Sequence, residues 1–227
     1  MESISVELLA ICGSTRAGGN TDQMLQFAAE VARLKGASLK TLNLRDYNFA
    51  PSSTCGDCNY RETPCELTDD MALIIEQMRR ADGIIYAVPV HGFGMGHLMQ
   101  MFIERSGVCF LRFDRPLTNK VGGAVIIGRR YNHSNVHSQI VSNLLLNRMI
   151  IVGSGFPAVL HGGRPNEVWD DLEGLDSARR MVNRMIDMVR TIKHYLQLTD
   201  RSFLTYEEAN ERTLDKDQLF LSREQFI

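Results

Sequence analysis

The residues best suited to do chemistry form a glycine- and hydroxyl-rich segment near the start of the chain, residues 13–21. The segment follows an apolar run, residues 8–12, and precedes apolar residues at helical spacing, so it predicts a strand-to-helix turn. Backbone N–H groups of such a turn, with the N-terminus of the helix, can bind one anionic group. The side chains that can add hydrogen bonds to that anion are Ser14, Thr15, Arg16, Asn20 and Thr21.

The turn lacks both G-x-G-x-x-G and the lysine-containing ending of a triphosphate-binding loop. We therefore expect it to bind a terminal monophosphate rather than a di- or triphosphate. The alternative is an ordinary turn in which Asn20 or Thr21 caps the helix.

Two later segments also have the composition of ligand-binding loops. Residues 89–97 contain Gly92, Gly94 and Gly96, which leave backbone exposed for a flat ligand. Residues 128–133 combine hydrogen-bond donors, cationic side chains and an aromatic ring. Taken singly, each segment could be an ordinary surface connection.

Apolar runs and helical patterns alternate along the chain and predict how these loops are positioned. The runs predict strands at residues 6–12, 38–44, 83–89, 121–128 and 149–155, and the helical patterns predict helices at residues 21–35, 68–80, 96–106, 135–146 and 175–196. This order predicts an α/β fold with a parallel sheet covered on both faces. Ligands bind at the carboxyl ends of such strands, so the three loops should line one crevice.

Composition narrows the class of protein. The chain has 227 residues, of which 44% are hydrophobic and 23% charged, as is usual for a globular domain. Its net charge of −2 gives no reason to expect a nucleic-acid or membrane partner. The start of the chain lacks the basic residues of a signal peptide, and the 5 cysteines do not resemble a secreted disulfide framework. We expect a cytoplasmic protein.

Four motifs occur in an order that resembles one known family. They are GSTRAGGNT at residues 13–21, ADGII at 81–85, PVHG at 89–92 and FIER at 102–105. The motifs resemble those of the flavodoxin-like NAD(P)H-dependent FMN reductases, in the branch that contains the iron–sulfur flavoproteins. The resemblance, which covers residues 6–196, implies a flavodoxin-like three-layer fold with a five-stranded parallel sheet in the order 2-1-3-4-5. It also implies bound FMN and NAD(P)H as the electron donor.

The resemblance implies roles for individual residues. The FMN phosphate would be held by Ser14, Arg16, Gly19, Asn20 and Thr21. The isoalloxazine would be lined by Pro89, Val90, His91, Gly92 and Phe93, and approached by Gly128, Arg129 and Arg130. We expect the second substrate to contact His91, Arg129, Arg130 and Tyr131. Hydride transfer requires no side-chain acid or base, so no catalytic residue is predicted.

Position 91 departs from the family, which usually has a tyrosine where this chain has His91. A histidine there can titrate near neutral pH and alter the flavin potential, or it can be a plain substitution.

The cysteines of residues 55–65 raise the question of a metal. Iron–sulfur flavoproteins carry four cysteines in a compact run here, and Arg61 stands where the third is expected. Because a 4Fe–4S cluster needs four thiolates, and Cys12 and Cys109 are distant in sequence, we predict no cluster and no other metal. Cys55 and Cys58 could instead form a redox pair, or the segment could shape the substrate pocket.

The last residues extend beyond the five-stranded core. We predict an FMN-binding domain at residues 1–196 and a C-terminal arm at 197–227. The arm carries apolar side chains that we expect to pack on a neighbouring subunit of a homodimer or homotetramer: Phe203, Leu204, Tyr206, Leu219 and Phe220. A disordered extension is the alternative.

These expectations combine into one function. We expect an oxidoreductase that passes hydride from NAD(P)H through FMN to a small acceptor, namely a quinone, free flavin or another electron-poor aromatic. The alternatives are an electron-transfer flavoprotein of the flavodoxin or iron–sulfur flavoprotein type, and a specialised flavoenzyme that acts on one metabolite.

Overall fold

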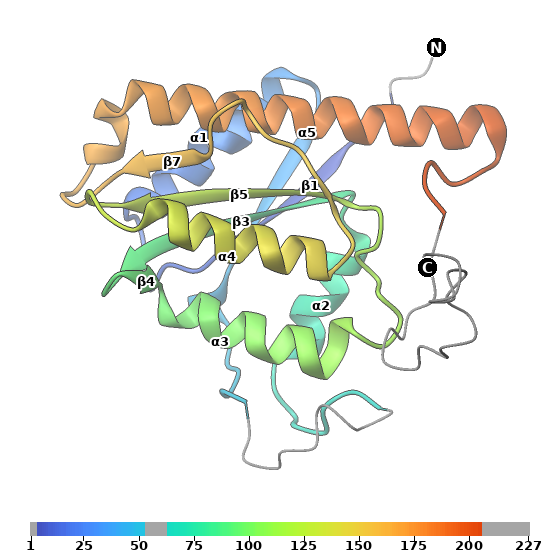
Figure 1. The fold of residues 1–227 in the computed structure, drawn as a ribbon, viewed down its shortest axis with the longest axis horizontal. Coiled ribbons are helices and arrows are strands. Elements are labelled where there is room, and N and C mark those ends of the chain that lie inside the picture. Colours follow the sequence, from blue (N-terminus) through green and yellow to red (C-terminus); the bar gives the residue numbers. More distant parts are fainter. Residues whose placement is uncertain (1–3, 53–62, 206–227) are drawn as a thin grey trace, which may run out of the picture.

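The computed structural model describes residues 4–52 and 63–205 of the chain. Its centre is a parallel sheet (Figure 1). The order of its strands, β2-β1-β3-β5-β6, confirms the predicted order of the five strands. The strands of this path are β1 (Glu7–Cys12), β2 (Ser38–Asn43), β3 (Gly83–His91), β5 (Val121–Gly128) and β6 (Ile150–Ile151). Two short strands lie off the path: β4 (Gly94–Met95) pairs antiparallel with β3, and β7 (Ala158–His161) pairs parallel with β5.

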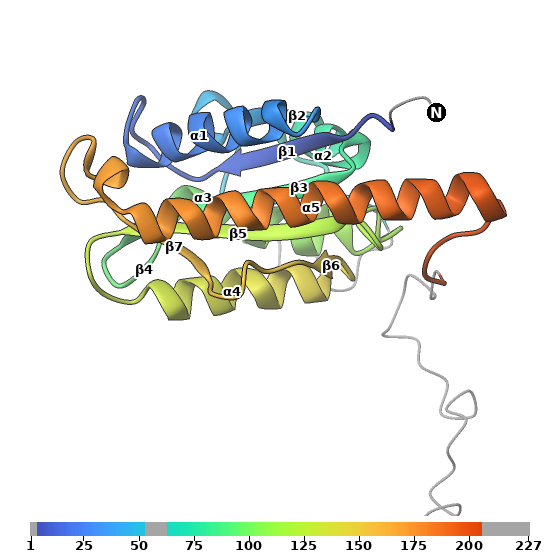
Figure 2. The ribbon, with the colours of Figure 1, turned by 90° about the horizontal axis from the view of Figure 1, so that it is seen from above.

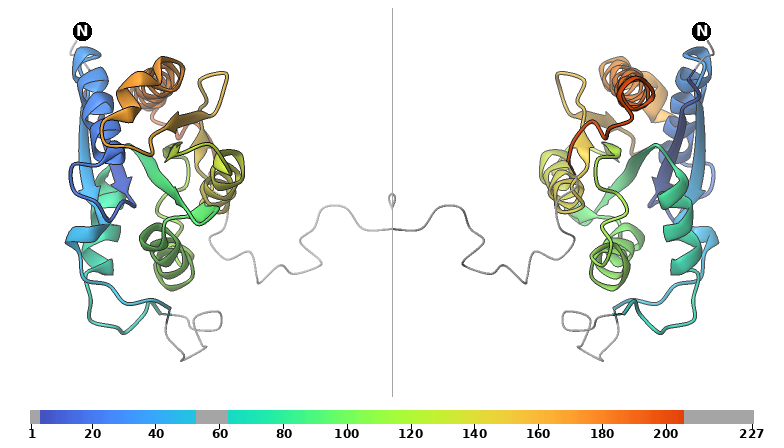
Figure 3. Two further views of the ribbon diagram at one scale, coloured as in Figure 1. Left: turned by 90° about the vertical axis from the view of Figure 1, so that its left-hand side faces the viewer. Right: turned by 90° about the vertical axis from the view of Figure 1, so that its right-hand side faces the viewer.

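Helices cover both faces of this sheet, as Figures 2 and 3 show. One layer contains α1 (Asn20–Leu34) and α5 (Leu172–Thr199), and the other contains α2 (Met71–Arg80), α3 (His97–Ser106) and α4 (His133–Leu146). Short helical segments are η1 (Leu44–Asp46), the π-helical η3 (Gly107–Leu111) and η4 (Glu167–Asp170). The predicted three-layer α/β architecture is confirmed.

The sequence of β1 shows why the sheet needs both layers. Leu8, Ala10 and Cys12 face the core beneath α1 and α5, while Leu9 and Ile11 face the core beneath α2 and α3. Successive strand residues point to opposite faces, so a strand with both faces covered is apolar throughout. Each central strand therefore ends in a loop at the edge of a rigid, buried support.

The predicted strand at residues 149–155 is wrong in its extent. Pairing with β5 stops after Ile151 and resumes only at Ala158, in β7. Gly153, Gly155 at φ +104° and Pro157 lie between the two strands, and residues of these types weaken or end strand pairing. The interruption has a consequence for function, because β7 carries the residues after His161 to the carboxyl edge of the sheet.

The end of α5 lies beyond the predicted domain boundary at residue 196. After Thr199 the chain turns back, the ring of Phe203 contacts Tyr195 at 5.6 Å, and Asn119 Nδ2 donates to Leu204 O at 3.1 Å. The first residues of the predicted arm thus contact their own subunit. Tyr206, Leu219 and Phe220 lie outside the described residues.

Among the described helices, none is both long and apolar enough to cross a membrane.

Candidate functional site

A cleft of about 580 Å³ lies at the carboxyl edge of the sheet, between the loops that follow β1, β3, β5 and β7. Most of the residues that were predicted to bind the cofactor line it: Ser14, Arg16, Gly19, Asn20, Thr21, Pro89, Val90, His91, Gly128 and Arg129. The predicted convergence of three loops on one crevice is therefore what the fold produces.

The N-terminus of α1 opens onto one end of the cleft. Its N-cap residue, Gly19, has no side chain that could cap the first amides, and no side-chain cap bond is present. The first N–H groups of a helix have no acceptor within the helix and carry the positive end of its dipole. Arg16 adds a guanidinium to the same end of the cleft. This end is therefore suited to a phosphate group.

An ion pair positions the turn from behind. Arg45, just after β2, makes a two-pronged bond to Asp22, with Nη1–Oδ1 at 3.0 Å and Nη2–Oδ2 at 2.9 Å. Arg45 Nη1 also donates to Ser14 O at 3.3 Å, and Asp22 Oδ2 accepts from Gly18 N at 2.7 Å. Arg45 neutralises the negative charge of Asp22, and Asp22 does not line the cleft. The Asp22 carboxylate therefore does not repel an anion bound there.

Cys12 lies beneath the same turn and is buried. Its Sγ donates to Asp22 Oδ1 at 3.4 Å, and burial raises the pKa of its thiol to about 12. The thiol stays protonated at neutral pH, so Cys12 is a packing residue rather than a nucleophile.

Close packing fixes the residue at the end of β5 that lines the cleft. A Cβ on Gly128 would lie 2.9 Å from Val90 Cβ and 3.1 Å from His133 Nε2, so only glycine fits at this end of β5. His91 lies at the end of the neighbouring strand β3, where partial burial, followed by the charges of Arg16 and His97, lowers its pKa. His91 is therefore mainly neutral at physiological pH.

A fourth loop, residues 162–166, lines the cleft and was not predicted. Asn20 Nδ2 donates to Arg164 O at 2.8 Å, and Gln23 Nε2 donates to Asn166 Oδ1 at 2.6 Å. The side chain of Asn20 is thus engaged by this loop, which leaves its backbone N–H for a ligand. Like the first three loops, this loop contains glycine, and it also carries an arginine, a composition that is typical of a ligand-binding loop. Because the fifth strand was predicted to end at residue 155, the sequence did not place this loop at the carboxyl edge of the sheet.

The permanently charged side chains that line the cleft are all positive. Arg16, Arg129 and Arg164 line it, and no Asp or Glu does. Within the described residues, the side chains of these arginines make no hydrogen bond or ion pair. Glu167 lies beside the cleft wall, where its carboxylate accepts from Gly163 N at 2.6 Å and Arg164 N at 2.7 Å and interacts electrostatically with Arg164 and Arg129. A cleft of about 650 Å³ at the other end of the sheet differs, because its Asp82 and Asp114 pair with Lys193 and Arg79. The carboxyl-edge cleft is the one that is electrostatically open to an anion.

Four predicted residues lie outside the wall of this cleft: Gly92, Phe93, Arg130 and Tyr131. The rings of Phe93 and Tyr131 pack against each other, with centroids 5.0 Å apart. Phe93 has φ +65°, a conformation that costs an aromatic residue roughly 1–3 kcal/mol.

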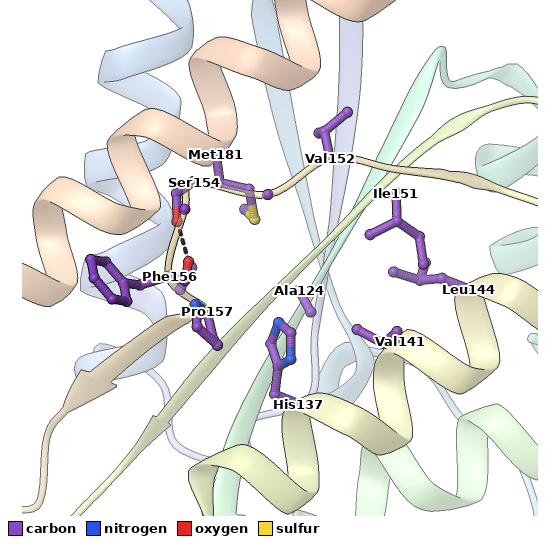
Figure 4. A pocket seen from close by; sticks show the side chains of 13 residues that line it. Ala124, His137, Val141, Leu144, Ile151, Val152, Ser154, Phe156, Pro157 and Met181 are labelled. Carbon is purple, nitrogen blue, oxygen red and sulfur yellow. Dashed lines mark hydrogen bonds between the residues drawn. The ribbon is translucent and has the colours of Figure 1, made fainter.

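A smaller cavity of about 170 Å³ lies between α4, α5 and the segment that joins β6 to β7 (Figure 4). His137 points into it beside apolar side chains such as Val141 and Met181, and burial lowers the pKa of His137. None of the predicted site residues lines this cavity.

The described cysteines form no metal site by themselves. Within the described residues, no group of three or more His, Cys, Asp or Glu side chains is placed to hold a metal ion. Cys55, Cys58 and Arg61 lie outside those residues, so the predicted absence of a cluster stays a prediction. The fold does bring Cys109, on η3, next to Cys65, whose N–H donates to Cys109 O at 3.2 Å.

Comparison with known proteins agrees with this geometry. Residues 6–163 match the family described as NADPH-dependent FMN reductase. The chain is 32% identical over 195 residues to an iron–sulfur flavoprotein of Methanocaldococcus jannaschii, covering 83% of this chain and 100% of the relative. It is 30% identical over 190 residues to an iron–sulfur flavoprotein of Methanosarcina thermophila, covering 83% and 97%.

A solved structure extends the likeness of fold to nearly the whole chain. RosB, solved with a bound intermediate, 8-demethyl-8-formylriboflavin-5′-phosphate, matches with a TM-score of 0.69 at 14% identity over 96% of each chain. At this identity the match shows the flavodoxin-like fold alone. The family match and the iron–sulfur flavoprotein relatives identify the chain as an FMN-dependent oxidoreductase that uses NAD(P)H, and the chain belongs to the NADPH-dependent FMN reductase family.

Proposed function

We propose that this oxidoreductase passes electrons from NAD(P)H to a small electron-poor aromatic molecule, of the quinone or free-flavin class. The observation that carries the proposal is the cleft itself, whose lining combines the uncapped N-terminus of α1 with Arg16, Arg129 and Arg164 and contains no Asp or Glu. When bound, FMN supplies the hydride chemistry, since it accepts a hydride from NAD(P)H and returns it to a two-electron acceptor.

The turn between β1 and α1 would hold the FMN phosphate. Arg16 provides charge, the uncapped start of α1 provides N–H groups, and the hydroxyls of Ser14 and Thr21 lie in the same wall. The absence of acidic side chains from the wall supports this assignment, because a carboxylate there would repel the phosphate.

The carboxyl ends of β3 and β5, with the first residue after β5, would bind the isoalloxazine. Pro89, Val90 and His91 form one wall, and Gly128 and Arg129 form the next. Among the described residues the Arg129 side chain makes no hydrogen bond or ion pair, and the carboxylate that interacts with it electrostatically, Glu167, does not line the cleft. We infer that Arg129 can meet an anionic group on the flavin or on the second substrate. The overall reaction with a quinone would consume NAD(P)H and one proton and release NAD(P)⁺ and a hydroquinone.

Anaerobic absorbance spectroscopy of the FMN-loaded protein tests the proposal. We expect NADH or NADPH to bleach the flavin bands, and 2-methyl-1,4-naphthoquinone or free FMN to restore them within the turnover time. If the reduced protein were reoxidised by ferredoxin but by neither small acceptor, the protein would be an electron carrier and the proposed function would be wrong.

A further inference from the structure

An exposed aromatic pair stands at the edge of the cleft. Phe93 lies at the tip of the hairpin between β3 and β4, and Tyr131 lies in the loop between β5 and α4. Their ring planes meet at 33°, and the exposed fractions of the two residues are 65% and 49%. Each lies two positions beyond a residue that lines the cleft, His91 and Arg129 respectively. The pair is therefore close to the cleft wall along both loops, and it is exposed and not part of the core.

The backbone that carries Phe93 is unusual for an aromatic residue. Gly92 and Phe93 have φ of +54° and +65°, and they close a two-residue hairpin in which His91 pairs with Gly94. Positive φ at both central residues is the mark of a type I′ turn, in which glycine, asparagine or aspartate is normally found. A bulky side chain is strained in this conformation. A strained aromatic residue at the edge of a site points to a function for its ring.

Hydrogen bonds hold the two loops together. Asn132 donates from Nδ2 to Phe93 O, and Asn135 Nδ2 donates to Asn132 Oδ1 at 2.5 Å. The hairpin and the loop that carries Tyr131 are therefore joined directly, outside the apolar core. A support that exists before a ligand arrives lowers the entropy lost on binding.

We propose that Phe93 and Tyr131 form a stacking platform that selects planar aromatic electron acceptors. The proposal rests on the proposed function, in which such an acceptor enters the cleft beside the isoalloxazine. A planar π-system can lie against the exposed rings, whereas a compact, non-planar acceptor gains nothing from them. The platform makes the shape of the acceptor, as well as its redox potential, a determinant of turnover.

The test compares two acceptors in the FMN-loaded enzyme, planar 2-methyl-1,4-naphthoquinone and octahedral ferricyanide. Phe93→Asn removes the ring and suits the turn, so the melting temperature should be unchanged or raised. The KM for the naphthoquinone should rise about threefold to tenfold. At saturating FMN, the KM for ferricyanide should stay within about twofold.

Matched variants separate stacking from other roles. Tyr131→Phe keeps a ring and should retain the wild-type KM for the naphthoquinone, whereas Tyr131→Ala should raise it. Phe156→Asn removes a phenylalanine that is 72% exposed and does not line the cleft, and it should change neither KM.

Two results for Phe93→Asn would overturn the platform: an unchanged KM for the naphthoquinone, or an equal rise for both acceptors. A smaller mass in light scattering with unchanged KM would assign the pair to a subunit contact instead. If the wild-type enzyme were reduced by NAD(P)H but could not pass electrons to the naphthoquinone, the proposed function would fail, and the platform with it.

Discussion

At the scale of single residues, Cys109 bears most directly on whether the protein carries metal. It lies on the π-helical segment η3, and its carbonyl accepts the N–H of Cys65, so two cysteines far apart in sequence become neighbours. Helical segments of this kind often occur at functional positions. Cys109 is distant from residues 55–65 in sequence, which argued against it as a metal ligand. The fold places it beside Cys65, so its distance in sequence no longer argues against it. What remains is Arg61, at the position where a third cysteine of the compact run is expected.

We predict that the purified protein contains no iron–sulfur cluster, because residues 55–65, with Arg61 at one of the expected cysteine positions, supply three thiolates and not the four of the compact run. Iron and acid-labile sulfide, measured after anaerobic purification, check this prediction. About four irons per chain would contradict it. In that event Cys109→Ser should lose the iron, whereas Cys12→Ser should keep it, since Cys12 lies beneath the phosphate turn and Cys109 lies beside Cys65.

At the scale of elements, the turn between β1 and α1 depends on the ion pair of Arg45 with Asp22. Both side chains are mostly buried, with 17% and 13% exposed. Arg45→Ala leaves the Asp22 carboxylate without its partner and should destabilise the fold by about 1.5–3 kcal/mol. The same variant should weaken FMN binding, because the turn loses the guanidinium that holds Ser14 O.

Arg33→Ala is the matched control for that prediction. Arg33 also pairs with a carboxylate on α1, Glu30, but this pair is 68% and 54% exposed. An exposed pair contributes about 0–1 kcal/mol, so both the melting temperature and the Kd for FMN should remain near those of the wild type. Similar losses in the two variants would show that Arg45 has no special role in positioning the turn.

Elements also show what could be predicted from the sequence and what could not. β1, the turn and α1 were predictable, because a strand apolar throughout, a glycine-rich turn and a helical apolar pattern are local signals. The loop at residues 162–166 was missed because β7 is only four residues long and follows a break in pairing. The pairing of Arg45 with Asp22, and the engagement of Asn20 by Arg164 O, depend on neighbours that only the folded sheet brings together.

At the scale of the whole molecule, the region after α5 bears on whether the chain forms an oligomer. The described part of the predicted arm, up to residue 205, returns to its own subunit through Phe203 and Leu204. We still propose that the chain forms a homodimer or homotetramer, with residues 206–227 contributing contacts between subunits. Their apolar residues, Tyr206, Leu219 and Phe220, support the proposal.

Deletion of residues 206–227 tests that proposal while leaving α5 and its contacts intact. We expect a smaller mass in light scattering and a higher Kd for FMN than in the full chain. An unchanged mass together with unchanged FMN affinity would leave the segment without a role in assembly.

The parts of the molecule meet at the cleft, and the central claim is that its α1 end binds the phosphate of FMN. The most direct measurement compares the affinities of FMN and riboflavin, which differ only in that phosphate, for the wild type and Arg16→Ala. A charge-assisted hydrogen bond contributes roughly 1.5–3 kcal/mol, so the variant should bind FMN about tenfold to a hundredfold more weakly. Its affinity for riboflavin should be nearly unchanged, and Arg184→Ala, at an exposed arginine of α5, should alter neither. Equal losses for FMN and riboflavin in Arg16→Ala would contradict the account.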